Sequence, residues 1–144
     1  MKARSIVRWY GFHCKKIYEP YYYQIKLRCH LKALEKAHSL VTVLEDKKAE
    51  KILLLDIHEL VSFTDYFIIC NGTSDRMLFA LAAAVRDYAK EELKEPLEIE
   101  GGSRDGWLVV DLGDVVVHLF SPELRDYYKL EQLWEKGKRL VSLQ

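Results

Sequence analysis

The sequence predicts an α/β fold in which helices flank a mixed sheet of about five strands. Short runs of apolar residues alternate along the chain with longer segments of helical period. In addition, 49% of the 144 residues are hydrophobic, which suffices for one packed core. The longest apolar runs, such as 52–55 and 115–117, are far shorter than the roughly 20 residues of a membrane span. We therefore expect one globular domain and no membrane partner.

Three segments have the apolar period of amphipathic helices. Residues 31–48 place Lys36 on the polar side, opposite a stripe of Leu34, Ala37, Leu40, Val41 and Leu44. A second helix is expected from Thr73 or Ser74 to about Lys94, because either residue caps a first turn and a proline follows. A third begins at Ser121-Pro122 and ends near Gly137, with the apolar members Leu124, Tyr127, Tyr128, Leu130, Leu133 and Trp134.

Strands are expected between these helices. Residues 52–57 and 65–70 are continuous apolar runs, which is typical of strands that are buried on both faces. A short strand is expected at 97–99. Residues 107–112 and 114–120 are predicted to form a hairpin around a glycine. The expected order is helix, two strands, helix, three strands, helix.

The charge is distributed unevenly along the chain. The formal net charge is zero, so nothing in the whole chain points to nucleic acid, and no specific DNA partner is expected. Residues 1–38, however, contain nine Lys/Arg and two Asp/Glu, whereas the other 106 residues contain 13 and 20, which gives net charges of +7 and −7. We interpret residues 1–32 as a basic N-terminal extension and 33–144 as the domain. The extension has three open interpretations: an unstructured segment, a short helix lying on the domain, or a targeting peptide.

The residues that could take part in catalysis or bind a metal do not form a recognisable catalytic, cofactor or metal site. His118 alternates with apolar neighbours in a strand, and Cys70 lies in an apolar run, so both are expected to be packing residues. Asp111 and Asp114 flank Leu112-Gly113, where turn formation explains them better than Mg²⁺ binding. The three cysteines and the lack of a secretory signal indicate a reduced, cytoplasmic chain.

Aromatic residues near the strand ends point instead to a protein partner. Trp107 begins a strand just after a glycine-rich loop and lies near the acids Asp105, Asp111 and Asp114. An aromatic side chain that is surrounded by carboxylates suits a partner with a basic surface. We therefore predict that Trp107 anchors a partner and that Trp134 packs inward.

Four stretches carry motifs that occur together in one family. They are 44–52, 64–76, which includes Thr-Asp-Tyr-Phe-Ile-Ile-Cys-Asn-Gly-Thr-Ser, 106–122, which includes Gly-Trp-Leu-Val-Val-Asp-Leu-Gly-Asp, and 125–134. In this order and combination they resemble the ribosomal silencing factor family, also called the Iojap family. The likeness covers about residues 33–136 and implies a nucleotidyltransferase-like α/β fold without the catalytic activity. Residues 1–32 have no counterpart in the family.

The resemblance also implies a function and partners. Such proteins bind the large ribosomal subunit through large-subunit ribosomal protein fourteen and sterically block joining of the small subunit, which lowers translation. The contact would use the strand region, so the expected binding residues are Trp107, Asp111, Leu112 and Asp114, with Asp105 beside them. A homodimer off the ribosome is plausible because exposed aromatic surfaces tend to self-associate. The expected location is the cytoplasm, with mitochondrion and plastid left open.

One alternative comes from a different class of protein. A metal-dependent nucleotidyltransferase would use the turn Gly72-Thr73-Ser74 together with acids at strand ends. That chemistry normally pairs a Gly-Ser turn with an Asp-x-Asp set, whereas the helix expected here contains Asp87 and no such pair. The sequence therefore favours a non-enzymatic repressor.

Overall fold

In the computed structural model, the described part of the chain begins at residue 19, and side chains are described from residue 27 onward. The chain divides into two compact units, residues 1–32 and 33–144. The first unit is described only over residues 19–32, all of which are helical. For residues 1–18 all three interpretations of the extension, as an unstructured segment, a short helix or a targeting peptide, fall outside the described residues.

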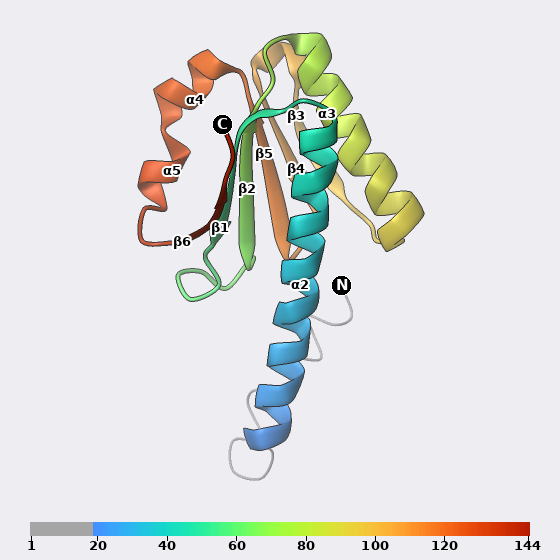
Figure 1. The fold of residues 1–144 in the computed structure, drawn as a ribbon, viewed down its shortest axis with the longest axis vertical. Coiled ribbons are helices and arrows are strands. Elements are labelled where there is room, and N and C mark those ends of the chain that lie inside the picture. The colour runs from blue at the N-terminus through green and yellow to red at the C-terminus, as the bar shows by residue number, and fades with distance from the viewer. Residues whose placement is uncertain (1–18) are drawn as a thin grey trace. The chain divides into compact units, whose positions relative to one another are not determined.

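A mixed sheet flanked by helices forms the second unit, which confirms the α/β fold predicted from the sequence (Figure 1). The strands are β1 (Glu50–Asp56), β2 (Tyr66–Asn71), β3 (Glu98–Gly102), β4 (Trp107–Asp111), β5 (Val115–Phe120) and β6 (Lys138–Ser142). The described helices are α2 (Glu19–Asp46), α3 (Asp75–Tyr88), α4 (Pro122–Tyr128) and α5 (Leu130–Leu133), with a π-helical segment η1 (Ala89–Leu93) and a 3₁₀ turn η2 (Ser103–Asp105). The strand order is β3-β4-β5-β2-β1-β6; β2 and β5 are parallel and all other neighbours antiparallel.

Helices cover both faces of the sheet (Figure 1). Alternate strand residues point to opposite faces, so Leu54 and Ile68 pack in the core beneath α2 and α3. On the other face Phe67 and Phe120 pack with Leu124 of α4. All of β2 and the centre of β1 are buried, as predicted for strands covered on both sides. Among residues 19–144, no helix combines the length and the hydropathy that crossing a bilayer requires.

The sheet has one strand more than the sequence predicts. β6 follows Gly137, where a cluster of basic residues suggested only the end of a helix. This strand lies at the sheet edge and pairs antiparallel with β1, so that Leu54 is opposite Val141. An edge strand has one neighbour and less buried surface, so its sequence gives only a weak apolar pattern.

The last predicted helix is divided into two. Lys129 adopts a left-handed conformation, with φ at 47°, which ends α4 before α5 begins. The apolar residues of the segment therefore do not share one buried stripe, and Tyr127 and Leu133 are 77% and 73% exposed. Trp134 follows α5 and is partly buried, with its ring edge-to-face on Phe67 at 5.5 Å between centroids.

The first predicted helix begins earlier than expected and buries a lysine. α2 starts at Glu19 rather than Leu31. An apolar period reports burial and not helicity, and Leu27 and Leu31 are both exposed, so the period does not predict the helix there. Lys36, expected on the polar side, is buried because its ammonium group pairs with Glu95 and Asp114.

Candidate functional site

An exposed strip of the sheet lies on β3 and β4, on the same face as α4 and α5. Trp107, Val109 and Asp111 alternate onto this face along β4. The antiparallel pairing places Glu100 of β3 opposite Val109 and Glu98 opposite Asp111. We call these five residues the β3–β4 face. Its three acids are exposed, whereas its tryptophan and valine are partly buried.

Aromatic rings continue from the core to the surface of this face. Trp107 stacks on buried Phe120, with 4.8 Å between centroids and 24° between ring planes. Trp107 also contacts Tyr128 of α4 at 5.0 Å between centroids, and Tyr128 in turn contacts Tyr127 edge-on at 5.0 Å. Both tyrosines are exposed. Rigid, partly exposed aromatic rings of this kind are typical anchors of protein–protein interfaces.

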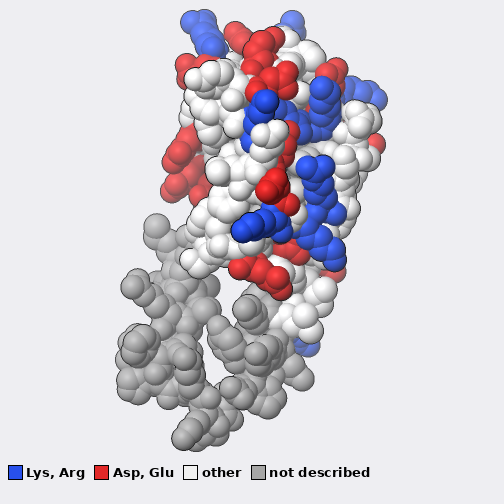
Figure 2. Space-filling model, turned by 90° about the vertical axis from the view of Figure 1, so that its left-hand side faces the viewer, with Lys and Arg blue, Asp and Glu red and all other residues white. Residues whose placement is uncertain are grey.

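The β3–β4 face is acidic. Neither β3 nor β4 contains Lys or Arg, and the turn η2 just before β4 adds one exposed acid, Asp105, and one exposed base, Arg104. The side of the molecule that lies on the left of Figure 1 carries Lys and Arg mixed with Asp and Glu (Figure 2). A patch of one sign attracts a partner of the opposite sign and speeds association.

The binding residues expected from the sequence lie in different places. Trp107 and Asp111 are on the β3–β4 face, and Asp105 lies beside its Trp107 end. Leu112 is buried, with 6% exposed, so its side chain packs in the core. Asp114 lies in the hairpin turn and its Oδ1 accepts a hydrogen bond from Lys36 of α2. The structure therefore brings three of the five residues together and separates the other two from them.

Lys36 is charged where it meets Asp114. Burial by itself lowers the pKa of this ammonium group, but hydrogen bonds to Asp114 and Glu95 outweigh it, and the pKa is raised overall. The carboxylate of Asp114 therefore joins the hairpin to α2. This contact gives Asp114 a structural role that the sequence did not indicate.

Three surface residues of this site were missed by the sequence reasoning. Glu98 and Glu100 lie in the short strand that was expected at 97–99, but its pairing partner was not identified. Tyr128 is one of the apolar members of the last expected helix, and its contact with Trp107 has no local sequence signal. The alternation of Glu98, Ile99 and Glu100 is the signal that could have placed both glutamates on one face.

The residues of the alternative nucleotidyltransferase site do not converge. The Gly72 amide donates to Phe120 O, which places the turn at the C-terminal end of β5, whereas Asp111 pairs with Val116 near its other end. Ser74 Oγ accepts from the Met77 amide and thus caps α3. Asp111 Oδ1 accepts from the Gly113 amide at 2.7 Å, which confirms its turn-forming role.

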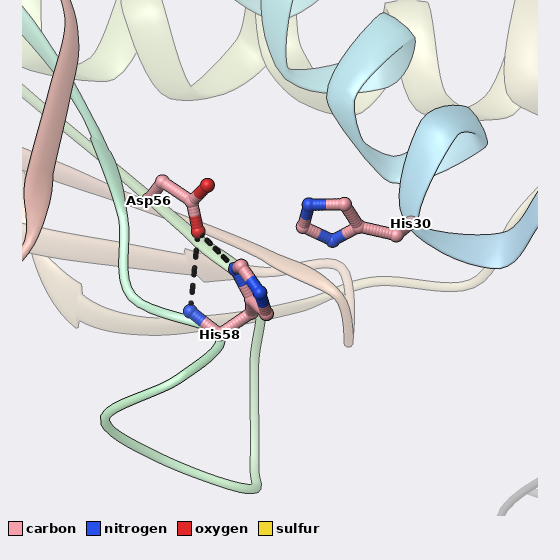
Figure 3. Close-up of side chains that lie close together, drawn as sticks. All are labelled: His30, Asp56 and His58. Atoms are coloured by element: carbon pink, nitrogen blue, oxygen red, sulfur yellow. Dashed lines mark hydrogen bonds and ion pairs between the residues drawn. The ribbon is translucent and has the colours of Figure 1, made fainter. Parts of the chain in front are cut away.

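Two other groups with possible chemistry lie away from the β3–β4 face. At the end of β1, Asp56 Oδ1 contacts Nδ1 of His58 at 2.5 Å and accepts from its backbone amide (Figure 3). A carboxylate orients an imidazole in this way, but nucleophilic catalysis also needs an activated nucleophile beside the pair. Burial raises the pKa of the Cys70 thiol to about 12, so this cysteine is an inert core residue.

Comparison with known proteins identifies the family. A family model described as "Ribosomal silencing factor during starvation" matches residues 30–144. The ribosomal silencing factor RsfS of Bacillus subtilis is 46% identical over 90 residues, which are 62% of this chain and 76% of that protein. A mouse protein named "Mitochondrial assembly of ribosomal large subunit protein 1" is 39% identical over 98 residues, 66% of this chain and 43% of its own length.

A solved structure agrees with these sequence matches. The crystal structure of a protein from Chromobacterium violaceum superposes with a TM-score of 0.67 at 36% identity. The superposition covers 76% of this chain and 90% of that one. Fold, sequence motifs and family model thus agree over the same part of the chain. The chain belongs to the family of ribosomal silencing factors.

Proposed function

We propose that the chain silences translation by binding the large ribosomal subunit through its β3–β4 face. The partner would be large-subunit ribosomal protein fourteen, and the bound domain would block joining of the small subunit. The observation that carries this proposal is the combination, on one exposed strip, of an aromatic anchor and three acids. Family membership and the names of the relatives supply the ribosomal context.

The chemistry of the strip suits a basic protein surface. Trp107 and Tyr128 supply apolar ring area, while Glu98, Glu100 and Asp111 lie farther along the same strip, beside and beyond Val109. An interface with this anatomy derives affinity from its central rings, and its acids contribute association rate and orientation. A domain bound in this way also excludes the small subunit by occupying its space, so the proposed function requires no catalysed reaction.

Charge reversal on the strip tests this proposal. The double variant Glu98→Lys/Glu100→Lys should lose at least about tenfold in affinity for isolated large subunits, because two attractive contacts become repulsive. Glu91→Lys/Glu92→Lys is the matched control, since these exposed acids lie on η1 and the change in net charge is equal. Affinity is measured by co-sedimentation through sucrose gradients, and subunit joining by the yield of complete ribosomes.

The two double variants separate the possible outcomes. Loss in the strip variant alone supports the β3–β4 face as the binding surface. Equal loss in both would mean that net charge and not this face determines binding. Normal binding by both would mean that another surface is used.

Self-association and location are further parts of the proposal. Because Trp107 is partly exposed and the tyrosines of α4 are exposed, a homodimer off the ribosome would bury the same strip and compete with the subunit. The oligomeric state of the wild type and of Glu98→Lys/Glu100→Lys, measured by sedimentation velocity, tests whether the dimer uses this strip. We propose a cytoplasmic location, which is tested by imaging the full chain with and without residues 1–32.

A further inference from the structure

A hydrogen bond connects the partly buried Trp107 to the buried His118 on the adjacent strand. The indole Nε1–H of Trp107 donates to Nδ1 of His118 at 3.3 Å. The two residues lie on adjacent strands, with His118 opposite Val109 and Trp107 opposite Phe120. Because Nδ1 accepts, the proton of the neutral imidazole is assigned to Nε2.

This arrangement leaves part of the histidine unsatisfied. His118 is 7% exposed, and its Nε2 is buried without a hydrogen-bond partner among the described residues. Burial lowers the pKa of His118 to about 4, so the ring is neutral at ordinary pH. A buried N–H without an acceptor costs folding stability.

The surroundings of the ring favour an apolar aromatic residue. Phe67 meets the His118 ring edge-on at 4.8 Å, and Phe120 is stacked against it at 6.2 Å. A phenylalanine would make these contacts without an unpaired donor of its own, although the indole N–H of Trp107 would lose its acceptor. The hydrogen bond to Trp107 is therefore the interaction of His118 that phenylalanine would not reproduce.

We propose that His118 is a positioning residue that fixes the orientation of the Trp107 indole on the β3–β4 face. Stacking on Phe120 and contact with Tyr128 keep the indole in place but do not by themselves determine which edge faces outward. The directional N–H···N bond selects one orientation. An indole held in its binding orientation avoids the entropy loss of ordering that side chain when the partner binds.

The effect on binding rests on the proposed function, but the effect on the indole does not. Ordering one side chain at an interface changes affinity by about 2- to 10-fold. In the full-length chain, His118→Phe should therefore bind isolated large subunits about 2- to 10-fold more weakly and unfold no more easily than wild type. The indole N–H resonance of Trp107, assigned by its loss in Trp107→Phe, should shift upfield and exchange faster with solvent.

A second variant separates positioning from a merely structural role. In His118→Asn, the side-chain oxygen can take the place of Nδ1 as acceptor, although the smaller side chain loses packing. His118→Asn should be less stable than His118→Phe, yet it should bind isolated large subunits more tightly than His118→Phe does. In a Trp107→Phe background, His118→Phe should cause no additional loss of affinity, because the bond is already absent.

The outcomes distinguish this inference from the proposed function. An unchanged Trp107 indole resonance in His118→Phe would overturn the positioning role regardless of ribosome binding. The positioning role would also be overturned if the affinity for large subunits fell in the same order as the free energy of unfolding across the His118 variants. If the resonance changes as expected but the wild-type chain does not co-sediment with large subunits, the positioning role stands and the proposed function fails.

Discussion

Replacing Arg125 by methionine should destabilise the domain by about 4 kcal/mol. The Arg125 side chain is only 9% exposed, and its Nε donates to Glu131 at 2.9 Å. Its Nη1 donates to the backbone oxygen of Lys51 at 2.6 Å and to the Asn71 side chain at 2.9 Å. One guanidinium therefore joins α4 to β1, β2 and α5.

The magnitude follows from what methionine leaves behind. It fills similar space but donates no hydrogen bond, so Glu131 and the buried oxygen of Asn71 lose their donor. Removing one side of a buried ion pair costs about 3–5 kcal/mol. An unmet neutral acceptor adds about 1–3 kcal/mol, and the partial exposure of Glu131, at 24%, reduces the first contribution.

Urea unfolding of the full chain measures this loss, and the thermal midpoint should fall by about 10–20 °C for a domain of this size. Arg86→Met is the matched control, because Arg86 and Asp87 form an ion pair whose side chains are 40% and 57% exposed. Such a pair contributes less than about 1 kcal/mol. Equal destabilisation by the two substitutions would refute the assignment of Arg125 as the residue that holds α4 in place.

Three further predictions concern other parts of the domain. Lowering the pH from 6.5 to 4 should reduce the free energy of unfolding of the wild type by up to about 3 kcal/mol relative to that of His118→Phe. The reason is that the unfolded histidine binds a proton near pH 6.5 and the folded one only near pH 4. Urea unfolding curves at each pH measure the difference. Lys36→Met should cost about 1–2 kcal/mol in the same assay, less than Arg125→Met, because its partners are partly exposed; a loss as large as that of Arg125→Met would contradict this. Gly101→Ala should cost about 1–3 kcal/mol, since φ is +86° and a Cβ would lie 2.4 Å from Trp107 O; an unchanged thermal midpoint would refute this strain.

The elements that the sequence predicts well are those with a strong local pattern. β2 and β5 are buried throughout and apolar except at Asn71 and His118, because a central strand needs mainly apolar residues on both faces. α3 has its cap at Ser74 and its buried stripe at the expected spacing. β6 and the division at Lys129 have no comparable local signal, because an edge pairing and a single left-handed residue depend on tertiary contacts.

The candidate site could be predicted only in part, for a reason that lies in strand geometry. Side chains alternate between faces along a strand, so Trp107 and Asp111 share a face while Leu112 continues into the core. The alternation of odd and even positions along the strand could by itself have separated Leu112 from Trp107 and Asp111. The pairing of Glu98 with Asp111 and that of Asp114 with Lys36 involve segments far apart in sequence, and no local pattern encodes them.

The position of Trp107 decides how mutations of this site must be interpreted. Its ring is at once part of the apolar cluster around Phe120 and the centre of the exposed strip. Trp107→Ala would therefore weaken folding and binding together, since truncating a packed aromatic residue costs several kcal/mol, and lost co-sedimentation would not show which had failed. Trp107→Phe retains an aromatic ring for stacking on Phe120 but removes the N–H and part of the ring area. Together with the surface reversals at Glu98 and Glu100, it separates the ring's contribution to the fold from its contribution to the interface.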